Sequence, residues 1–159
     1  AMTEPDAPPS IFLVGPMGSG KTAVGRRLAQ VLGLEFVDSD DVIEERSGVD
    51  IPFIFEREGE AGFRERERRV IDDLTARPGI VLATGGGAAM DPASRACLHD
   101  RGFVVYLHTS VEHQLRRTRS GRPRPLLSRG DPRETLARLL AIREPQYREI
   151  AHLVIDTDG

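Results

Sequence analysis

Short apolar runs recur along the sequence, and longer segments with apolar residues at helical spacing separate them. Each run is bounded by glycine or by polar residues, a pattern that is typical of a buried β-strand. The predicted strands cover residues 11–14, 34–37, 80–83, 103–108 and 153–155.

The intervening segments predict helices. In the first of them, Val24, Leu28, Val31 and Leu32 recur at the spacing of one helix face. The predicted helices cover residues 21–32, 41–47, a short stretch from about residue 52, then 59–76, 92–100, 110–118 and 132–150. Strands that alternate with helices predict an α/β fold, in which a parallel sheet is covered on both faces and binds ligands at the carboxyl ends of its strands.

Length and composition narrow this picture. The 159 residues, 17.5 kDa, predict one domain over residues 11–159 after a polar, proline-rich arm over residues 1–10 that we expect to be flexible. The net charge of -3 weighs against a nucleic-acid partner. The single cysteine, Cys97, cannot form an internal disulfide, and no apolar run approaches the roughly 20 residues of a membrane span. We therefore expect a cytoplasmic protein without a membrane partner.

The stretch Gly-Pro-Met-Gly-Ser-Gly-Lys-Thr at residues 15–22 matches a nucleotide-binding phosphate loop, or P-loop, between a predicted strand and a predicted helix. Its glycines let backbone N–H groups turn towards phosphate oxygens, and the start of the helix attracts negative charge. Lys21 is the only lysine in the chain. A narrow loop has room for its compact ammonium group but not for an arginine fork.

We therefore expect Lys21 to bind the β- and γ-phosphates of ATP and the Thr22 hydroxyl to bind Mg²⁺. The nucleotide-binding residues predicted in this loop are Gly18, Ser19, Gly20, Lys21, Thr22 and Ala23.

Two clusters that follow predicted strands bear on the phosphate acceptor. Asp38 and Asp40 follow the second strand, where both carboxylates can face the cleft of the phosphate loop, or where the aspartates can instead cap the next helix. Gly85, Gly86 and Gly87 follow the third strand and permit a close backbone approach to a ligand, although a plain loop has the same composition.

Two arginine-rich segments remain. Residues 60–69 mix acidic residues with arginines, which is typical of a solvated helix face, and nothing local distinguishes Arg64. Residues 116–129 hold six arginines and two prolines and predict a loop. We expect a mobile lid over about residues 116–130 that closes over the phosphates, while an exposed basic loop is the alternative.

Taken in order, the motifs GPMGSGKT, DSD, GEAGFRERE, TGGGA and RPLL, followed by REPQYR, make the chain resemble the shikimate kinase family from residue 11 to residue 156. The resemblance implies a P-loop, three-layer α/β/α fold like that of nucleoside monophosphate kinases, with a five-stranded parallel sheet in the order 2-3-1-4-5. It also implies transfer of the ATP γ-phosphate to the 3-hydroxyl of shikimate, a step towards chorismate and the aromatic amino acids.

The same resemblance implies a role for individual residues. Asp38 would hold Mg²⁺ through water, and Asp40 would bind the shikimate hydroxyls and take the proton. Arg117 would stack on adenine, and Arg124 would reach the phosphates from the lid. The residues implied to bind shikimate are Asp40, Arg64, Gly85, Gly86, Gly87 and Arg143. The resemblance also implies a shikimate-binding helical segment at about residues 40–77. We expect the protein to be a monomer.

Two other functions stay open at this point. Another small-molecule kinase of similar fold, such as a gluconate kinase, would also use an arginine clamp because gluconate is an acid. A nucleotide-binding module without catalysis would need the phosphate loop but would have no use for the residues Asp40, Arg64, Arg124 and Arg143.

Overall fold

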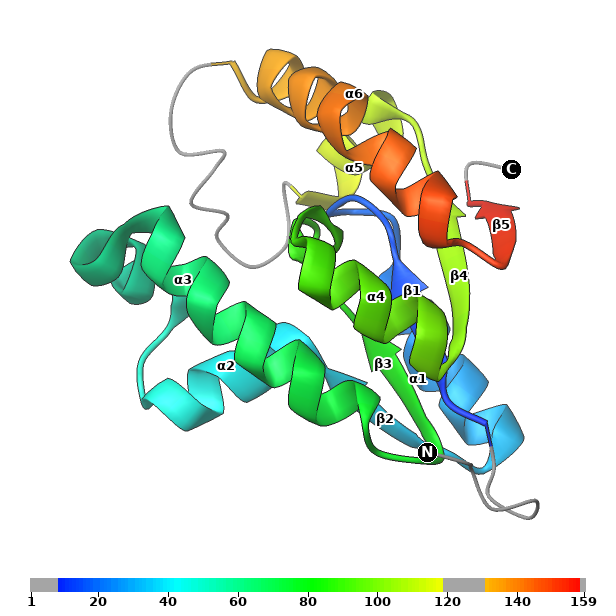
Figure 1. The fold of residues 1–159 in the computed structure, drawn as a ribbon. Helices are drawn as coiled ribbons and strands as arrows, with labels where there is room; N and C mark the ends of the chain where they lie inside the picture. Colours follow the sequence, from blue (N-terminus) through cyan, green and yellow to red (C-terminus); the bar gives the residue numbers. More distant parts are fainter. Residues whose placement is uncertain (1–8, 119–130, 158–159) are drawn as a thin grey trace.

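The computed structural model describes residues 9–118 and 131–157. Its centre is one sheet of five parallel strands in the order β2-β3-β1-β4-β5, which confirms the order that the family resemblance implied (Figure 1). The strands are β1 (Ile11–Val14), β2 (Glu35–Asp38), β3 (Ile80–Ala83), β4 (Phe103–His108) and β5 (Leu153–Asp156).

Helices connect the strands and cover the sheet. They are α1 (Lys21–Leu32), α2 (Ser39–Ser47), α3 (Ile51–Thr75), α4 (Pro92–Arg101), α5 (Val111–Thr118) and α6 (Pro132–Ile150), with the 3₁₀ helix η1 (Ala88–Met90) after β3. In Figure 1, α3, α4 and α6 lie in front of the sheet and α1 lies behind it.

The strands bury side chains on both faces because residues along a strand point alternately to opposite sides. In β1, Phe12 and Val14 join the larger core that α2, α3, α4 and α6 cover, whereas Leu13 faces Ala29 of α1 in a smaller core. The strand β5 differs, since all four of its residues are exposed at the sheet edge. Helices therefore cover both faces of the sheet, as predicted, while the edge strand β5 stays exposed.

The element boundaries differ most from the prediction in two places, and elsewhere by at most one residue at the ends of α4, α5 and β5. The second strand begins and ends one residue later than predicted, and α2 begins directly after it, at Ser39, because the Asp38 side chain caps the helix. The two helices predicted around residues 52 and 59–76 form a single element, α3, interrupted at Gly59, where φ is 74° and ψ is −179°. Glycine adopts this backbone conformation without strain, so the chain bends there and continues as a helix.

The start of β1 is anchored by a side chain. Ser10 is buried, and its hydroxyl donates to the carbonyl of Arg77 at 2.9 Å and accepts from the N–H of Ile80 at 3.2 Å. The flexible arm proposed for residues 1–10 therefore ends before Ser10, and residues 1–8 lie outside the described part of the chain. Among the described residues, no helix has both the length and the apolar composition needed to cross a bilayer.

Candidate active site

The phosphate loop connects β1 to α1 at the carboxyl end of the central strand. Gly20 precedes the helix with φ 90° and ψ 20°, a left-handed conformation that glycine adopts at little cost. Among the described residues, no side-chain hydrogen bond caps the start of α1 at Gly20. The N–H groups of the first turn are therefore available to an anion, which the positive end of the helix dipole attracts.

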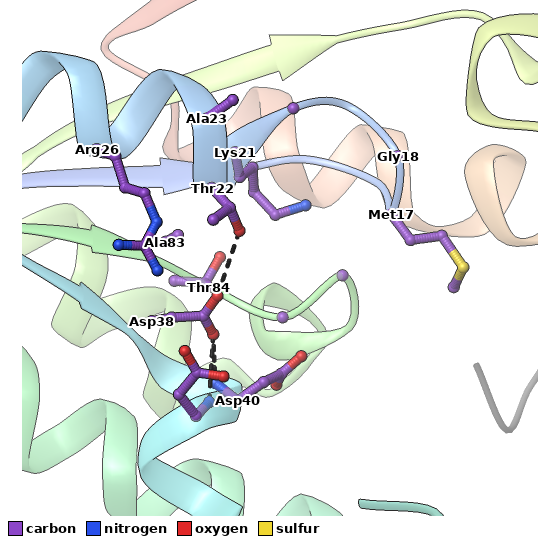
Figure 2. A pocket seen from close by; sticks show the side chains of 14 residues that line it. Met17, Gly18, Lys21, Thr22, Ala23, Arg26, Asp38, Asp40, Ala83 and Thr84 are labelled. Atoms are coloured by element: carbon purple, nitrogen blue, oxygen red, sulfur yellow. Dashed lines mark hydrogen bonds between the residues drawn. The ribbon is translucent and has the colours of Figure 1, made fainter. Parts of the chain in front are cut away.

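The Lys21 side chain folds over this loop. Its Nζ donates to the carbonyl of Gly15 at 2.6 Å and to that of Pro16 at 2.8 Å. An ammonium group has three donors on a single small atom, so it fits a space bounded by successive backbone carbonyls. The one lysine of the chain thus places its charge at the loop that Figure 2 shows facing β2 and β3.

Asp38 performs both of the roles that its sequence left open. Its Oδ1 accepts from the N–H groups of Asp40 at 2.8 Å and Asp41 at 3.3 Å, which caps α2. Its Oδ2 lies 3.4 Å from the Thr22 hydroxyl, which donates to it (Figure 2). One carboxylate therefore caps the helix with one oxygen and faces the phosphate loop with the other.

This oxygen pair suits a magnesium ion. Mg²⁺ prefers hard oxygen ligands and is held in kinases by few protein groups together with phosphate oxygens. Within residues 9–118 and 131–157, no group of three or more His, Cys, Asp or Glu side chains is arranged to hold a metal. The hydroxyl of Thr22 and the Oδ2 atom of Asp38 fit an ion that substrate phosphates also bind.

A cleft of about 580 Å³ unites the donor and acceptor residues. The phosphate loop and α1 form one wall, and the ends of β2 and β3 form the other, from which Asp40 faces the loop (Figure 2). The cleft is lined by Met17, Gly18, Gly20, Lys21, Thr22, Ala23, Arg26, Asp38, Asp40, Asp41, Ala83, Thr84, Gly85 and Gly86.

Arg64 and Glu67 lie beside the glycine segment. Arg64 Nη1 lies 2.8 Å from Glu67 Oε1, and a Cβ added to Gly87 would lie 2.5 Å from Arg64 Nη2. A Cβ added to Gly85 would lie 2.8 Å from Asp40 Oδ1 and 3.0 Å from Glu67 Oε2. The absence of side chains at residues 85–87 thus lets α2 and α3 bring their charged groups against the backbone of this segment.

Arg143 reaches the same segment from α6. It is 5% exposed, and its Nη1 would lie 3.1 Å from a Cβ at Gly86. Arg64 and Arg143 both interact electrostatically with Glu67. Two guanidinium groups therefore approach each other in a partly buried site, where an anion lowers their mutual repulsion.

Glu67 is a site residue that the sequence prediction missed. It is 3% exposed, and burial raises its carboxyl pKa although Arg64 and Arg143 act to lower it. No hydrogen-bond partner of its Oε2 exists among the described residues. The sequence does hold a signal, because Glu67 lies four residues after Phe63 and four before Ile71, within the apolar face of α3.

The structure brings most of the predicted site residues together. The residues that line the cleft or contact the glycine segment are Gly18, Gly20, Lys21, Thr22, Ala23, Asp38, Asp40, Arg64, Gly85, Gly86, Gly87 and Arg143. Ser19 is buried inside the phosphate loop and does not line the cleft. Arg117 belongs to α5, but its side chain lies outside the described part, as do Arg124 and the rest of the proposed lid from residue 119.

Comparisons with known proteins agree with this geometry. Residues 17–159 match the family model "Shikimate kinase". A curated shikimate kinase of Halorhodospira halophila is 60% identical over 152 residues, which is 96% of this chain and 86% of that protein. The solved structure of shikimate kinase from Acinetobacter baumannii in complex with shikimate is 55% identical, has a TM-score of 0.93 and covers 96% of this chain and 85% of its own.

The gluconate kinase alternative receives support at the level of fold alone. A gluconokinase structure from Sinorhizobium meliloti is 20% identical with a TM-score of 0.58, over 96% of this chain and 84% of its own. The family match over residues 17–159 and the high identity to curated relatives go well beyond a shared fold. This chain belongs to the shikimate kinase family.

Proposed function

We propose that this protein transfers the γ-phosphate of ATP to the 3-hydroxyl of shikimate, giving shikimate 3-phosphate and ADP. The observation that supports this most directly is the approach of Arg64 and Arg143, from two different helices, to the glycine segment that borders the phosphate-loop cleft. A cleft with a phosphate site at one end and a carboxylate site beside it suits a donor nucleotide and a small acidic alcohol.

The phosphate loop would bind the donor. Its backbone N–H groups and the start of α1 would surround the phosphate oxygens, and Lys21 would turn from the loop carbonyls to the β- and γ-phosphates. We propose that Arg117 stacks on adenine and that Arg124 reaches the phosphates from the lid. Both proposals rest on the family motifs alone.

The same reasoning assigns the metal. Thr22 and Asp38 are the residues that we propose to hold Mg²⁺, supported by their oxygens 3.4 Å apart at the cleft. Bound there, the ion would offset the negative charge of the phosphates. Asp38 would meanwhile keep its second oxygen on the start of α2, so its orientation does not depend on the ligand.

The acceptor would be oriented by its carboxylate. A planar guanidinium binds a carboxylate through two parallel hydrogen bonds, and two such groups fix the position and the rotation of the ring. Backbone groups of Gly85 to Gly87 would contact the ring. Asp40 would accept hydrogen bonds from the ring hydroxyls and take the proton of the attacking one.

This arrangement favours an anionic acceptor over a neutral sugar. Arg64 and Arg143 are both largely buried. A neutral acceptor bound beside them would leave part of the positive charge of the two guanidinium groups without a negative partner. Glu67 balances part of their charge, so the site retains an attraction for one carboxylate. Gluconate also carries a carboxylate, and only an acceptor panel separates these two acids.

Three further statements stay proposals. We propose that residues 11–159 act as a single kinase domain with a lid at about residues 116–130 and a shikimate-binding segment at about 40–77. We propose a monomer because one chain supplies every residue assigned to the site. We propose the cytoplasm as its location because that compartment holds the ATP on which the reaction depends.

A coupled assay of ADP release from Mg-ATP tests the function. We expect release that requires shikimate, that gluconate does not replace, and that is lost in Asp40→Asn. Asp73→Asn is the matched control, since Asp73 is exposed on α3 and pairs with Arg46 at 2.7 Å. Turnover with gluconate alone would indicate the other kinase, and ATP binding without any acceptor-dependent turnover would indicate a module that only binds nucleotide.

A further inference from the structure

Tyr147 lies at the junction of the acceptor groups, and although it belongs to the REPQYR motif, it has been given no role above. It is on α6, and its side chain is completely buried. Its hydroxyl donates a hydrogen bond to the carbonyl of Gly86. A side chain near the end of the chain therefore holds the middle of the glycine segment that follows β3.

The guanidinium of Arg143, one helical turn earlier on α6, interacts electrostatically with the same hydroxyl. Burial raises the pKa of Tyr147 to about 12, so the phenol keeps the proton that it donates to Gly86. One oxygen thus connects a guanidinium proposed to bind the acceptor carboxylate with a backbone proposed to contact the acceptor ring.

Gly86 is itself placed between the two halves of the site. A Cβ at this residue would lie 3.1 Å from Nη1 of Arg143 and 3.5 Å from the backbone nitrogen of Met17 in the phosphate loop. A shift of Gly86 would therefore change its position relative to both the acceptor clamp and the donor loop. The bond from Tyr147 to the Gly86 carbonyl restrains that shift.

The Tyr147 ring is held independently of its hydroxyl. It packs against Tyr106 of β4, with ring centroids 5.1 Å apart, and Tyr106 is also completely buried. The Tyr106 hydroxyl donates to Glu144 Oε2 at 2.8 Å. Removal of the hydroxyl from Tyr147 would therefore leave its ring in place. The effect of Tyr147→Phe can thus be assigned to the lost hydroxyl.

We infer that Tyr147 is a positioning residue of the kinase, whose hydroxyl holds the Gly86 backbone and the Arg143 guanidinium in the relative positions that an acidic acceptor requires. It acts through those two groups. The inference deepens the proposed function and depends on shikimate being the acceptor.

Steady-state kinetics of Tyr147→Phe test it. Loss of the hydrogen bond to Gly86 and of the interaction with Arg143 is expected to raise the shikimate KM about tenfold, while the ATP KM stays within about twofold and kcat falls by less than about threefold. Tyr106→Phe is the matched control, because it removes the neighbouring hydroxyl, which binds Glu144 and not the site. It should leave the shikimate KM within about twofold.

A double-mutant cycle with Arg143→Lys separates positioning from general support of the fold. If Tyr147 acts through Arg143, the double variant should be at most about twofold worse than the worse single variant. Independent effects that multiply, or equal rises in the KM of shikimate and ATP, would overturn the inference. Wild-type protein without shikimate-dependent turnover would instead overturn the proposed function, whereas an active wild type and an unaltered Tyr147→Phe variant would overturn the inference alone.

A second measurement needs no substitution at Tyr147. The chain has two tyrosines, so 3-fluorotyrosine labelling should give two ¹⁹F resonances, which Tyr106→Phe assigns. Shikimate should shift the resonance of Tyr147 and leave that of Tyr106 within its linewidth. A shift confined to Tyr106, or no shift at saturating shikimate in an enzyme that turns over, would contradict the inference.

Discussion

The substitution Gly87→Ala should displace Arg64 without disturbing the backbone. Gly87 has φ −100° and ψ 4°, which alanine also adopts. Its new methyl group would lie 2.5 Å from Nη2 and 2.7 Å from Cζ of Arg64, closer than atoms can approach. The guanidinium is the mobile end of a long side chain, so we expect it to move away from Glu67 and from the acceptor site.

The magnitude follows from the contact that is lost. A hydrogen bond to a charged group contributes about 1.5–3 kcal/mol, which corresponds to a rise of about ten- to 150-fold in the shikimate KM. The ATP KM should change little, because Gly87 and Arg64 are not among the described residues that line the phosphate-loop cleft. The coupled ADP assay gives both constants, and circular dichroism confirms that the variant is folded.

Two companion variants make this prediction specific. In an Arg64→Ala background, Gly87→Ala should add almost nothing, because both changes remove the same contact. Arg66→Ala is the matched control, since Arg66 lies on the same helix, has a side chain that is 41% exposed and pairs with Glu58 at 2.7 Å. An unchanged shikimate KM in Gly87→Ala, or the full effect in the absence of Arg64, would refute the reasoning.

Four other outcomes can be checked. Lys21→Met should lower kcat about 10²–10³-fold because a donor to the transferred phosphate is lost, while calorimetry should still detect shikimate binding. Gly25→Ala should lower the melting temperature by about 2–12 °C, because its Cβ would lie 2.5 Å from Cε1 of Phe36; an unchanged melting curve would contradict the packing described. Glu67 has a raised pKa in the fold and keeps its proton where the unfolded chain has lost it, so its contribution to stability should decline as pH rises above about 4.5. In urea unfolding above about pH 4.5, the free energy of unfolding should fall more steeply with rising pH in the wild type than in Glu67→Gln. The same pH dependence in both proteins would contradict this prediction. Hydrogen exchange at residues 116–130 should slow only when both substrates are added, and identical exchange with and without them would argue against a lid.

The phosphate loop could be predicted because its function is local. The glycines, Lys21 and Thr22 lie within eight consecutive residues, which form the six-residue loop between β1 and α1 and the first two positions of α1. For Asp38 the sequence left two roles open, because an aspartate after a strand is typical both of a helix cap and of a residue that faces the cleft. The structure shows that the two oxygens of one carboxylate serve both purposes.

The acceptor groups could not be found in this way. Arg64 is one of several arginines on a charged helix, and only the family resemblance singled it out. Glu67 and Tyr147 were not identified, because their importance depends on contacts with residues far away in the sequence, such as the bond between Tyr147 and the carbonyl of Gly86.

The sequence by itself determined the alternation of strands and helices, the phosphate loop and the family, because apolar spacing and contiguous motifs are properties of neighbouring residues. Tertiary structure alone decided which charges meet. Parallel strands end at one edge of the sheet, so β1, β2 and β3 place their loops together, while α3 and α6 carry Arg64 and Arg143 across that edge to the glycine segment. Residues that are about 80 positions apart become neighbours there because burying the apolar faces of these helices against one sheet leaves their polar residues at its carboxyl edge.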